Sequence, residues 1–274
     1  YEIMPSLVGS EMCIRDSIKI ALIGHPYLLY DEYINHGIIK SLIDMGVLPL
    51  FPENVPARKL REAISKIAGR AYWSFEEEII GAGGYYMDRE DVKGIIALEA
   101  FGCGPDSLMV DMLKRYARRK NKPFMSLVLD QHTTKTGVLT RIEAFMDMVR
   151  RSKPGKTFFI KRGEEGGIRV LGIPNIANLG EAFRKSAEIL GIKLLTPPIT
   201  KRTLDLGVKY SPEFICLPFK VMLGTFIECL ESGADTLFMV TSFNACRMGY
   251  YAKLQEEILK DMGYKFKFLK YKSE

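Results

Sequence analysis

Short apolar runs alternate with longer amphipathic segments along this chain, and this alternation constrains the fold more than any other feature. The first runs are IKIALIG (18–24), VLPLF (47–51), GIIALEA (94–100) and FMSLVLD (124–130). A run that is apolar throughout indicates a strand buried on both faces, as in parallel sheets. Helix-like segments separate the runs, and strands that alternate with helices predict βαβ units.

A charged, glycine-rich stretch at 151–167, broken by Pro154, interrupts this pattern and is typical of a linker. The alternation then restarts with IRVLGIP (168–174), IKLLTPP (192–198), TLFMVT (236–241) and KFKFLKY (265–271). We therefore predict an α/β fold with two Rossmann-like, three-layer domains, each with a mostly parallel sheet of about four strands. The domains span 18–151 and 168–274, and residues 152–167 join them.

The first 17 residues, YEIMPSLVGSEMCIRDS, show no helix or strand period and run directly into the first strand. They have neither the basic region nor the apolar core of a signal peptide. The string resembles translated adapter sequence at the end of a fragmentary gene model, so we interpret 1–17 as non-native. A disordered leader is the alternative, and under either interpretation Cys13 is excluded from the chemistry.

Composition excludes several classes of protein. The 274 residues are 47% hydrophobic and 26% charged, with a formal net charge of +6. The longest basic cluster, KRYARRKNK (114–122), is typical of a solvated helix end, so we expect no nucleic-acid partner. No apolar run approaches the roughly 20 residues of a membrane span. Five cysteines, an odd number, do not suit a disulfide framework and favour a reducing cytoplasm.

Three cysteines lie at predicted helix starts. Cys103 follows the third strand in FGCGPDS, Cys246 follows TLFMVT in the matching place of the second domain, and Cys216 lies in SPEFICLPFK. A helix N-terminus favours thiolate over thiol. For each of the three, a small core residue is the alternative, and for Cys229, inside an amphipathic helix, it is the favoured one. Because 29 residues separate Cys216 from Cys246, their spacing alone does not establish a metal site.

Other polar residues are weaker candidates. His132, in DQHTTKTG just after a strand, suits proton transfer or substrate anchoring, or else a loop that caps the next helix. His25, after the first strand, either faces the cleft or is a hydrogen-bonded structural residue. We predict that Asn35 caps the helix near His36, and that GAGGYY (81–86) ends a helix. The chain has no Walker loop and no G-x-G-x-x-G, so we expect the ATPase step on another protein.

The blocks around these cysteines resemble the 2-hydroxyacyl-CoA dehydratase family, which includes 2-hydroxyglutaryl-CoA dehydratase and benzoyl-CoA reductase subunits, in its activase-associated branch. GHPYLLYDEYINHGI, FGCGPDS and DQHTTKTGVLTRIEAF, within 18–151, resemble the C-terminal α/β domain of such a subunit. SPEFICLPFK and NACRMGYY, within 168–272, resemble the N-terminal α/β domain of another. The order departs from the family, because the C-terminal-type half comes first, as in a fusion, a fragment of a longer protein or an artefactual join.

The resemblance implies a 4Fe–4S cluster held by Cys103, Cys216 and Cys246, within one chain or shared with partner subunits. It implies an ATP-dependent activase and a homologous dehydratase-type subunit as partners, and an acyl-CoA as substrate. One low-potential electron then reaches the thioester carbonyl, and the ketyl radical anion expels an oxygen substituent. Lys220 and Arg247 are candidates for contacts with CoA phosphates. The implied activity is a lyase of anaerobic metabolism; the alternative is a non-catalytic homologue that acts as an interaction or electron-relay module.

Overall fold

The structure is a computed structural model that describes residues 17–69, 73–151, 168–174, 179–241 and 248–272. The chain divides into two compact units, Tyr1–Phe158 (unit 1) and Phe159–Glu274 (unit 2), each of which we treat by itself. The division falls within the stretch predicted as a linker, 152–167, which lies outside the described residues.

Unit 1 contains a four-stranded parallel sheet in the order β2-β1-β3-β4. Its strands are β1 (Ile18–Ile23), β2 (Val47–Leu50), β3 (Val92–Ala100) and β4 (Phe124–Leu129). Its helices are α2 (Pro26–Tyr30), α3 (Ile38–Asp44), the 3₁₀ turn η1 (Pro52–Asn54), α4 (Ala57–Ile67), α5 (Ser74–Met87), α6 (Gly104–Lys120) and α7 (Lys135–Arg151).

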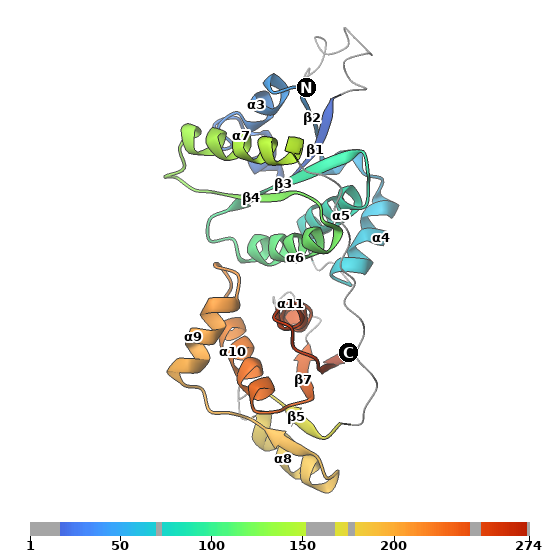
Figure 1. Cartoon of the computed structure of the whole chain (residues 1–274), viewed down its shortest axis with the longest axis vertical. Helices are drawn as coiled ribbons and strands as arrows, with labels where there is room; N and C mark the ends of the chain where they lie inside the picture. The colour runs from blue at the N-terminus through green and yellow to red at the C-terminus, as the bar shows by residue number, and fades with distance from the viewer. Residues whose placement is uncertain (1–16, 70–72, 152–167, 175–178, 242–247, 273–274) are drawn as a thin grey trace. The chain divides into compact units, whose positions relative to one another are not determined.

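Helices cover both faces of this sheet, so unit 1 has three layers. Figure 1 shows α3 and α7 on one face and α4, α5 and α6 on the other. The central strands are apolar because they are buried from both sides: Ile20, Leu22 and Ile96 are fully buried. The burial of these side chains supplies the hydrophobic free energy that holds the layers together.

Unit 2 has the same sheet order, β6-β5-β7-β8, and all its strands are parallel. Its strands are β5 (Val170–Gly172), β6 (Lys193–Leu195), β7 (Thr236–Thr241) and β8 (Lys267–Lys272). Its helices are α8 (Leu179–Ile189), α9 (Lys201–Tyr210), α10 (Leu217–Glu231) and α11 (Met248–Asp261). The predicted fold class, an α/β chain with two mostly parallel sheets, is confirmed.

In each unit a pair of helices packs through glycines. A Cβ atom on Gly81 of α5 would lie 2.9 Å from the Cβ of Leu60 on α4, so α5 approaches α4 closely where it lacks side chains. Helix α5 continues through GAGGYY to Met87, and the prediction that this segment ends a helix is wrong. The glycines serve helix packing rather than helix termination. In unit 2, Cβ atoms on Gly207 and Gly224 would overlap with backbone carbonyls of the facing helix in the α9–α10 pair.

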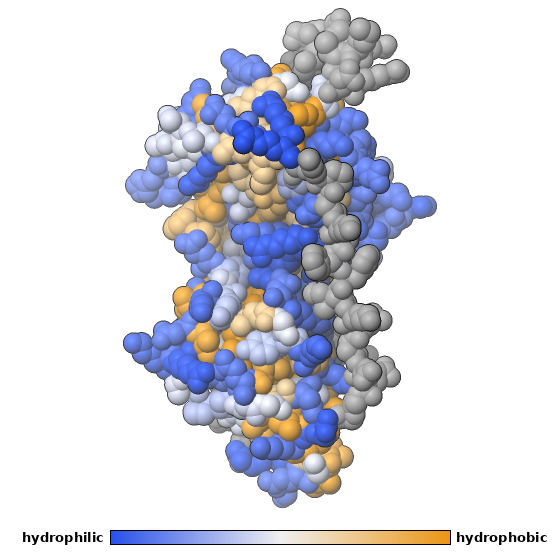
Figure 2. Space-filling model, viewed as in Figure 1, coloured by the Kyte–Doolittle hydropathy of each residue, from blue (hydrophilic) through white to orange (hydrophobic). Residues whose placement is uncertain are grey.

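The surface of both units is largely polar. Figure 2 shows hydrophilic residues spread over the face in view, with hydrophobic residues in patches between them. Edge strand β8 carries exposed lysines at Lys267 and Lys270, a charge pattern that opposes pairing with a further strand. Among the helices of the described residues, none is long and apolar enough to cross a bilayer.

Candidate functional site

In unit 1 the loops after β1 and β3 leave the carboxyl ends of two neighbouring strands, and we call the region between these loops the crevice. The strand order reverses there, because the chain goes from β1 outward to β2 and then returns to β3 on the other side. Loops that leave two such neighbouring strands diverge, and ligands of open α/β sheets bind between them. The loop after β1 carries His25, and the loop after β3 carries Cys103.

Two glycines set the course of these loops. A Cβ atom on Gly24 would lie 2.9 Å from the carbonyl oxygen of Leu98, so only glycine lets the end of β1 run so close to β3. Gly102 has a φ of +74°, in the left-handed region that favours glycine. Cys103 is the N-cap of α6, with extended backbone at φ −75° and ψ 104°, and Pro105 follows at the start of the helix.

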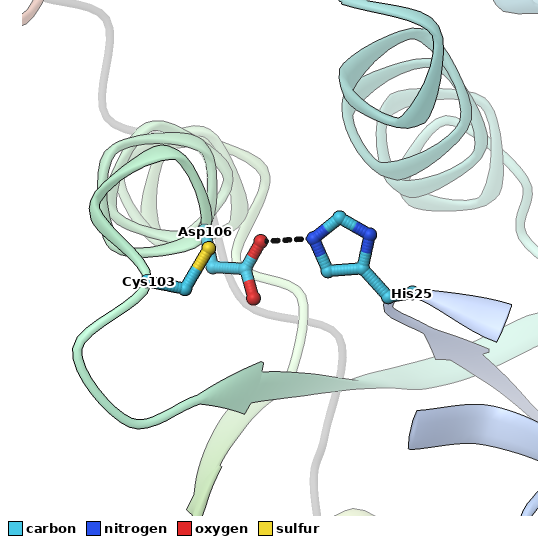
Figure 3. Close-up of side chains that lie close together, drawn as sticks. All are labelled: His25, Cys103 and Asp106. Atoms are coloured by element: carbon cyan, nitrogen blue, oxygen red, sulfur yellow. Dashed lines mark hydrogen bonds and ion pairs between the residues drawn. The ribbon is translucent and has the colours of Figure 1, made fainter. Parts of the chain in front are cut away.

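Three potential ligand atoms converge in the crevice, one each from His25, Cys103 and Asp106, and all lie within 4.8 Å of one another (Figure 3). His25 Nε2 lies 2.7 Å from Asp106 Oδ1. The second carboxylate oxygen, Asp106 Oδ2, accepts a hydrogen bond from the backbone N–H of Ala100 at 3.1 Å. The Asp106 side chain is only 1% exposed, so these bonds fix its orientation. The crevice therefore contains three potential metal-ligand atoms that already lie close together: one sulfur, one nitrogen and one oxygen.

The neighbours of His25 hold its imidazole as a cation. Its hydrogen bond with the Asp106 carboxylate, and then that with Cys103, raise its pKa to about 10, against the opposing effect of burial. Two aromatic rings fix the orientation of the imidazole: Tyr27 stacks on it with centroids 5.6 Å apart, and Phe75 packs edge-on at 5.1 Å. The imidazole therefore has a defined ring plane and a defined partner for Nε2.

The crevice opens to solvent and lies beside a cavity. Cys103 is free of any disulfide and partly exposed. A cavity of about 1000 Å³ is bounded by Ala100 and Leu129 at the carboxyl ends of β3 and β4, and Tyr27, the ring that stacks on His25, also lines it. Lys40 and Lys135 contribute positive charges to its wall, and acidic side chains lie there as well. Its volume suits a ligand of cofactor size.

Glu99, near the end of β3, is a second buried acid close to the crevice. Its side chain is 6% exposed, and burial raises its pKa to about 7, while a hydrogen bond with Ser126 opposes the shift and the charge of Asp106 adds to it. Glu99 therefore gains or loses a proton near neutral pH, and its charge influences the field around Asp106.

In unit 2, Cys216 is the N-cap of α10, with Pro218 in the first turn of the helix, as Pro105 is in α6. The thiol is partly exposed, and its Sγ contacts the hydroxyl of Tyr251 from the first turn of α11. Lys220 donates to the carbonyl oxygen of Glu213 at 3.2 Å.

Cys246 and Arg247 lie outside the described residues. Cys229 is fully buried, as expected, and burial raises its pKa to about 12.

His132 lies exposed in the turn between β4 and α7. Its backbone N–H donates to Asp130 Oδ1 at 2.9 Å, and Thr134 Oγ1 accepts from the N–H of Gly137 at the start of α7. The prediction that Asn35 is the N-cap of this helix is wrong, because the N-cap of α3 is Gly37. Asn35 Oδ1 nevertheless accepts hydrogen bonds from the backbone N–H groups of Gly37 and Ile38.

Sequence reasoning identified Cys103 but not its partners. The sequence does not single out Asp106, and it leaves His25 open between a place in the cleft and a structural role. The sequence does contain a signal for this site: polar residues follow each of two apolar strands closely, in GHP and in GCGPD. The sequence does not say that these two strands are neighbours, and only the strand order places His25 opposite Asp106.

Comparison with known proteins gives one family match. Residues 5–55, which include β1, β2 and His25, match the model of the CoA enzyme activase uncharacterised domain. No curated protein matches the chain. Among solved structures, the glycosyltransferase SnogD from Streptomyces nogalater aligns over 90% of this chain and 88% of its own, at 11% identity and a TM-score of 0.18, which is too low to carry an argument. The family match relates the N-terminal part of the chain to CoA-enzyme activase systems in general.

Proposed function

We propose that this chain is the iron–sulfur component of a 2-hydroxyacyl-CoA dehydratase-like system in a reducing cytoplasm. It accepts an electron from an ATP-dependent activase and, with a homologous dehydratase-type subunit, acts on an acyl-CoA. The match of residues 5–55 to a domain of CoA enzyme activases supports a place in such a system. The specific role rests on the cysteines and on the family resemblance of the blocks around them.

The observation that carries the proposal is the position of Cys103. Its thiol is partly exposed at the N-cap of α6, in the crevice where the strand order reverses, beside a cavity of about 1000 Å³. Iron–sulfur clusters are bound through cysteine thiolates. A buried filler residue would not be expected at the mouth of a ligand crevice.

The internal repeat of the fold supports a second thiol site. The chain goes from β2 to β3 through the helix pair α4–α5, and from β6 to β7 through the pair α9–α10. Phe75, at the start of α5, packs on His25 in the crevice of unit 1. Cys216, at the start of α10, has the equivalent place in unit 2, and its contact with Tyr251 brings it to the first turn of α11. Cys246 precedes that helix in the sequence.

The donor chemistry fits a cluster as far as the described residues extend. Cys103 and Cys216 form no disulfide and are partly exposed. We assign Cys246 as the third ligand of a cluster that is held within one chain or shared with a partner subunit. When bound, the cluster supplies one electron at low potential and a Lewis-acidic iron. We assign Lys220 and Arg247 to the CoA phosphates and His132, exposed in its turn, to proton transfer with the substrate.

Anaerobic purification of the full chain tests this proposal. We expect iron and acid-labile sulfide in equal amounts, about four of each per cluster, and an electron paramagnetic resonance signal on reduction. Cys103→Ser, Cys216→Ser and Cys246→Ser should each abolish the signal. Cys229→Ala is the matched control: its thiol is buried in the core, so the signal should persist.

Two outcomes oppose the proposal. A colourless wild-type chain that lacks iron and sulfide after anaerobic reconstitution, yet binds an activase, would assign the chain to a non-catalytic interaction module. A cluster that survives all three serine substitutions would show that other residues hold it.

A further inference from the structure

The crevice of unit 1 holds metal-ligand chemistry that does not depend on the cysteines of unit 2. Its three donors are His25 Nε2, Cys103 Sγ and a carboxylate oxygen of Asp106, all within 4.8 Å of one another (Figure 3). They come from the loop after β1 and from the N-cap and first turn of α6, which the parallel sheet holds together. We propose that His25, Cys103 and Asp106 form a binding site for one divalent transition-metal ion, held by unit 1 on its own.

Asp106 is the most constrained of the three donors. Its side chain is 1% exposed, and its Oδ2 is fixed by the backbone N–H of Ala100. A carboxylate so deeply buried is costly unless a cation compensates its charge. His25 is placed to compensate that charge, because its Nε2 lies 2.7 Å from Oδ1. A divalent cation between Oδ1 and Nε2 would compensate the same carboxylate.

The donor set selects the class of metal. One thiolate, one imidazole nitrogen and one carboxylate oxygen suit Zn²⁺ and similar first-row ions, whereas Mg²⁺ and Ca²⁺ prefer sites made of oxygen alone. A metal ion binds Nε2 and Sγ only in their deprotonated forms, so ion binding releases protons to solvent. The two ring contacts of His25, with Tyr27 and Phe75, already fix the imidazole plane that a ligand needs.

Three protein ligands leave one position of a tetrahedral ion open. Cys103 and His25 are partly exposed, so solvent can reach the donor set. The inference goes beyond the proposed function, because it concerns the cluster-free chain and requires no residue of unit 2. Cys103 would serve the ion in that state and the cluster when the cluster is assembled.

Cobalt binding tests the site. The full chain, freed of metal by chelation and kept reduced, is titrated with Co²⁺, whose absorption reports both a thiolate ligand and tetrahedral geometry. We expect one Co²⁺ per chain with a sulfur-to-cobalt charge-transfer band, and displacement by one Zn²⁺. Cys103→Ser should abolish the band, and His25→Gln and Asp106→Asn should each weaken binding by about tenfold or more.

Matched variants separate this site from the cluster. The Cys216→Ser/Cys246→Ser double variant should bind Co²⁺ as the wild type does, and so should His132→Gln, whose imidazole lies exposed outside the crevice. The inference is overturned if the wild type shows no charge-transfer band, or if the double variant loses it. Iron and sulfide contents after anaerobic reconstitution decide the proposed function separately.

A second measurement uses the wild-type chain alone, so it tests the site even if the variants fail to fold. X-ray absorption at the zinc edge of the wild-type chain should fit one sulfur together with nitrogen and oxygen neighbours. A fit with no sulfur, or with three, would overturn the site without recourse to any substitution.

Discussion

At the scale of single residues, Asp106 does more than any other side chain to shape the crevice. One oxygen accepts from His25 beyond β1, and the other accepts from the N–H of Ala100 at the end of β3. A single buried residue therefore joins two strand ends to the first turn of α6. Because hydrogen bonds to charged groups contribute about 1.5–3 kcal/mol each, this residue supports the local fold as well as the donor set.

Glu99 gives a prediction on pH at the same scale. Its folded pKa, about 7, is raised above the ordinary 4.5, so the folded chain binds the proton more tightly than the unfolded chain. Its contribution to the free energy of unfolding is therefore retained below pH 4.5 and falls as pH rises through 7. Glu99→Gln removes this pH-dependent loss. The change that it causes in the free energy of unfolding should therefore be more favourable at pH 8 than at pH 4, by up to roughly 3 kcal/mol.

Urea unfolding of the wild type and the variant at both pH values measures this difference. Glu90→Gln is the control, because Glu90 is exposed and its substitution should have nearly the same small effect at both values. If the difference in free energy of unfolding between Glu99→Gln and the wild type is the same at both pH values, the pKa of Glu99 is not raised by burial.

At the scale of elements, the strands were the most predictable part of the fold. The eight strands of the described residues all overlap the runs predicted from the sequence. The signal is clearest for β1 and β3, since a strand buried on both faces leaves a continuous apolar signature. The sequence does not predict α2, because its five residues, PYLLY, are too few to show a period. For α5 the glycines of GAGGYY predict a helix end, whereas Gly81 and Gly84 make close contacts with α4, which local sequence does not reveal.

The candidate site was predictable in one part only. Cys103 could be selected because it follows a strand and precedes a helix, two features of local sequence. The bond between His25 and Asp106 joins residues 81 positions apart and exists only because β1 and β3 are neighbours. No local pattern contains that neighbour relation.

The α9–α10 pair gives a prediction on packing. A methyl group on Gly224 would overlap with the carbonyl oxygen of Thr203, which is backbone and cannot turn away. Gly224→Ala should therefore destabilise the chain by about 1–3 kcal/mol, the usual cost of overpacking. Thermal unfolding followed by circular dichroism measures the loss.

Gly137→Ala is the matched control for this variant. Gly137 lies in helix α7, where an added Cβ would meet only the Thr134 hydroxyl, at 3.2 Å. This change should be neutral or stabilising by up to about 1 kcal/mol, the ordinary gain of alanine over glycine in a helix. Equal losses in both variants would argue against a specific contact between α9 and α10.

At the scale of the whole molecule, the two units repeat one plan. Each has a four-stranded parallel sheet whose first and third strands lie at the centre, in the orders β2-β1-β3-β4 and β6-β5-β7-β8. The central strands of both units contain fully buried residues, such as Ile20 and Ile96 in unit 1 and Leu237 in unit 2. The chain therefore has two hydrophobic cores.

Hydrogen exchange followed by mass spectrometry tests this plan. We expect two separate sets of slowly exchanging amides, on β1 and β3 and on β5 and β7, because these strands are paired on both sides. Gly224→Ala should accelerate exchange on β5 and β7 more than on β1 and β3. Equal acceleration on all four strands would mean that the units open together.

The absence of side chains where α9 meets α10 also limits how Cys216 can be moved. Backbone rests on backbone at Gly207 and Gly224, so neither helix can slide along the other without a collision. A movement of α10, whose N-cap is Cys216, would therefore carry α9 with it. The backbone changes that such a movement requires would fall in the segments that flank the pair, 196–200 and 232–235.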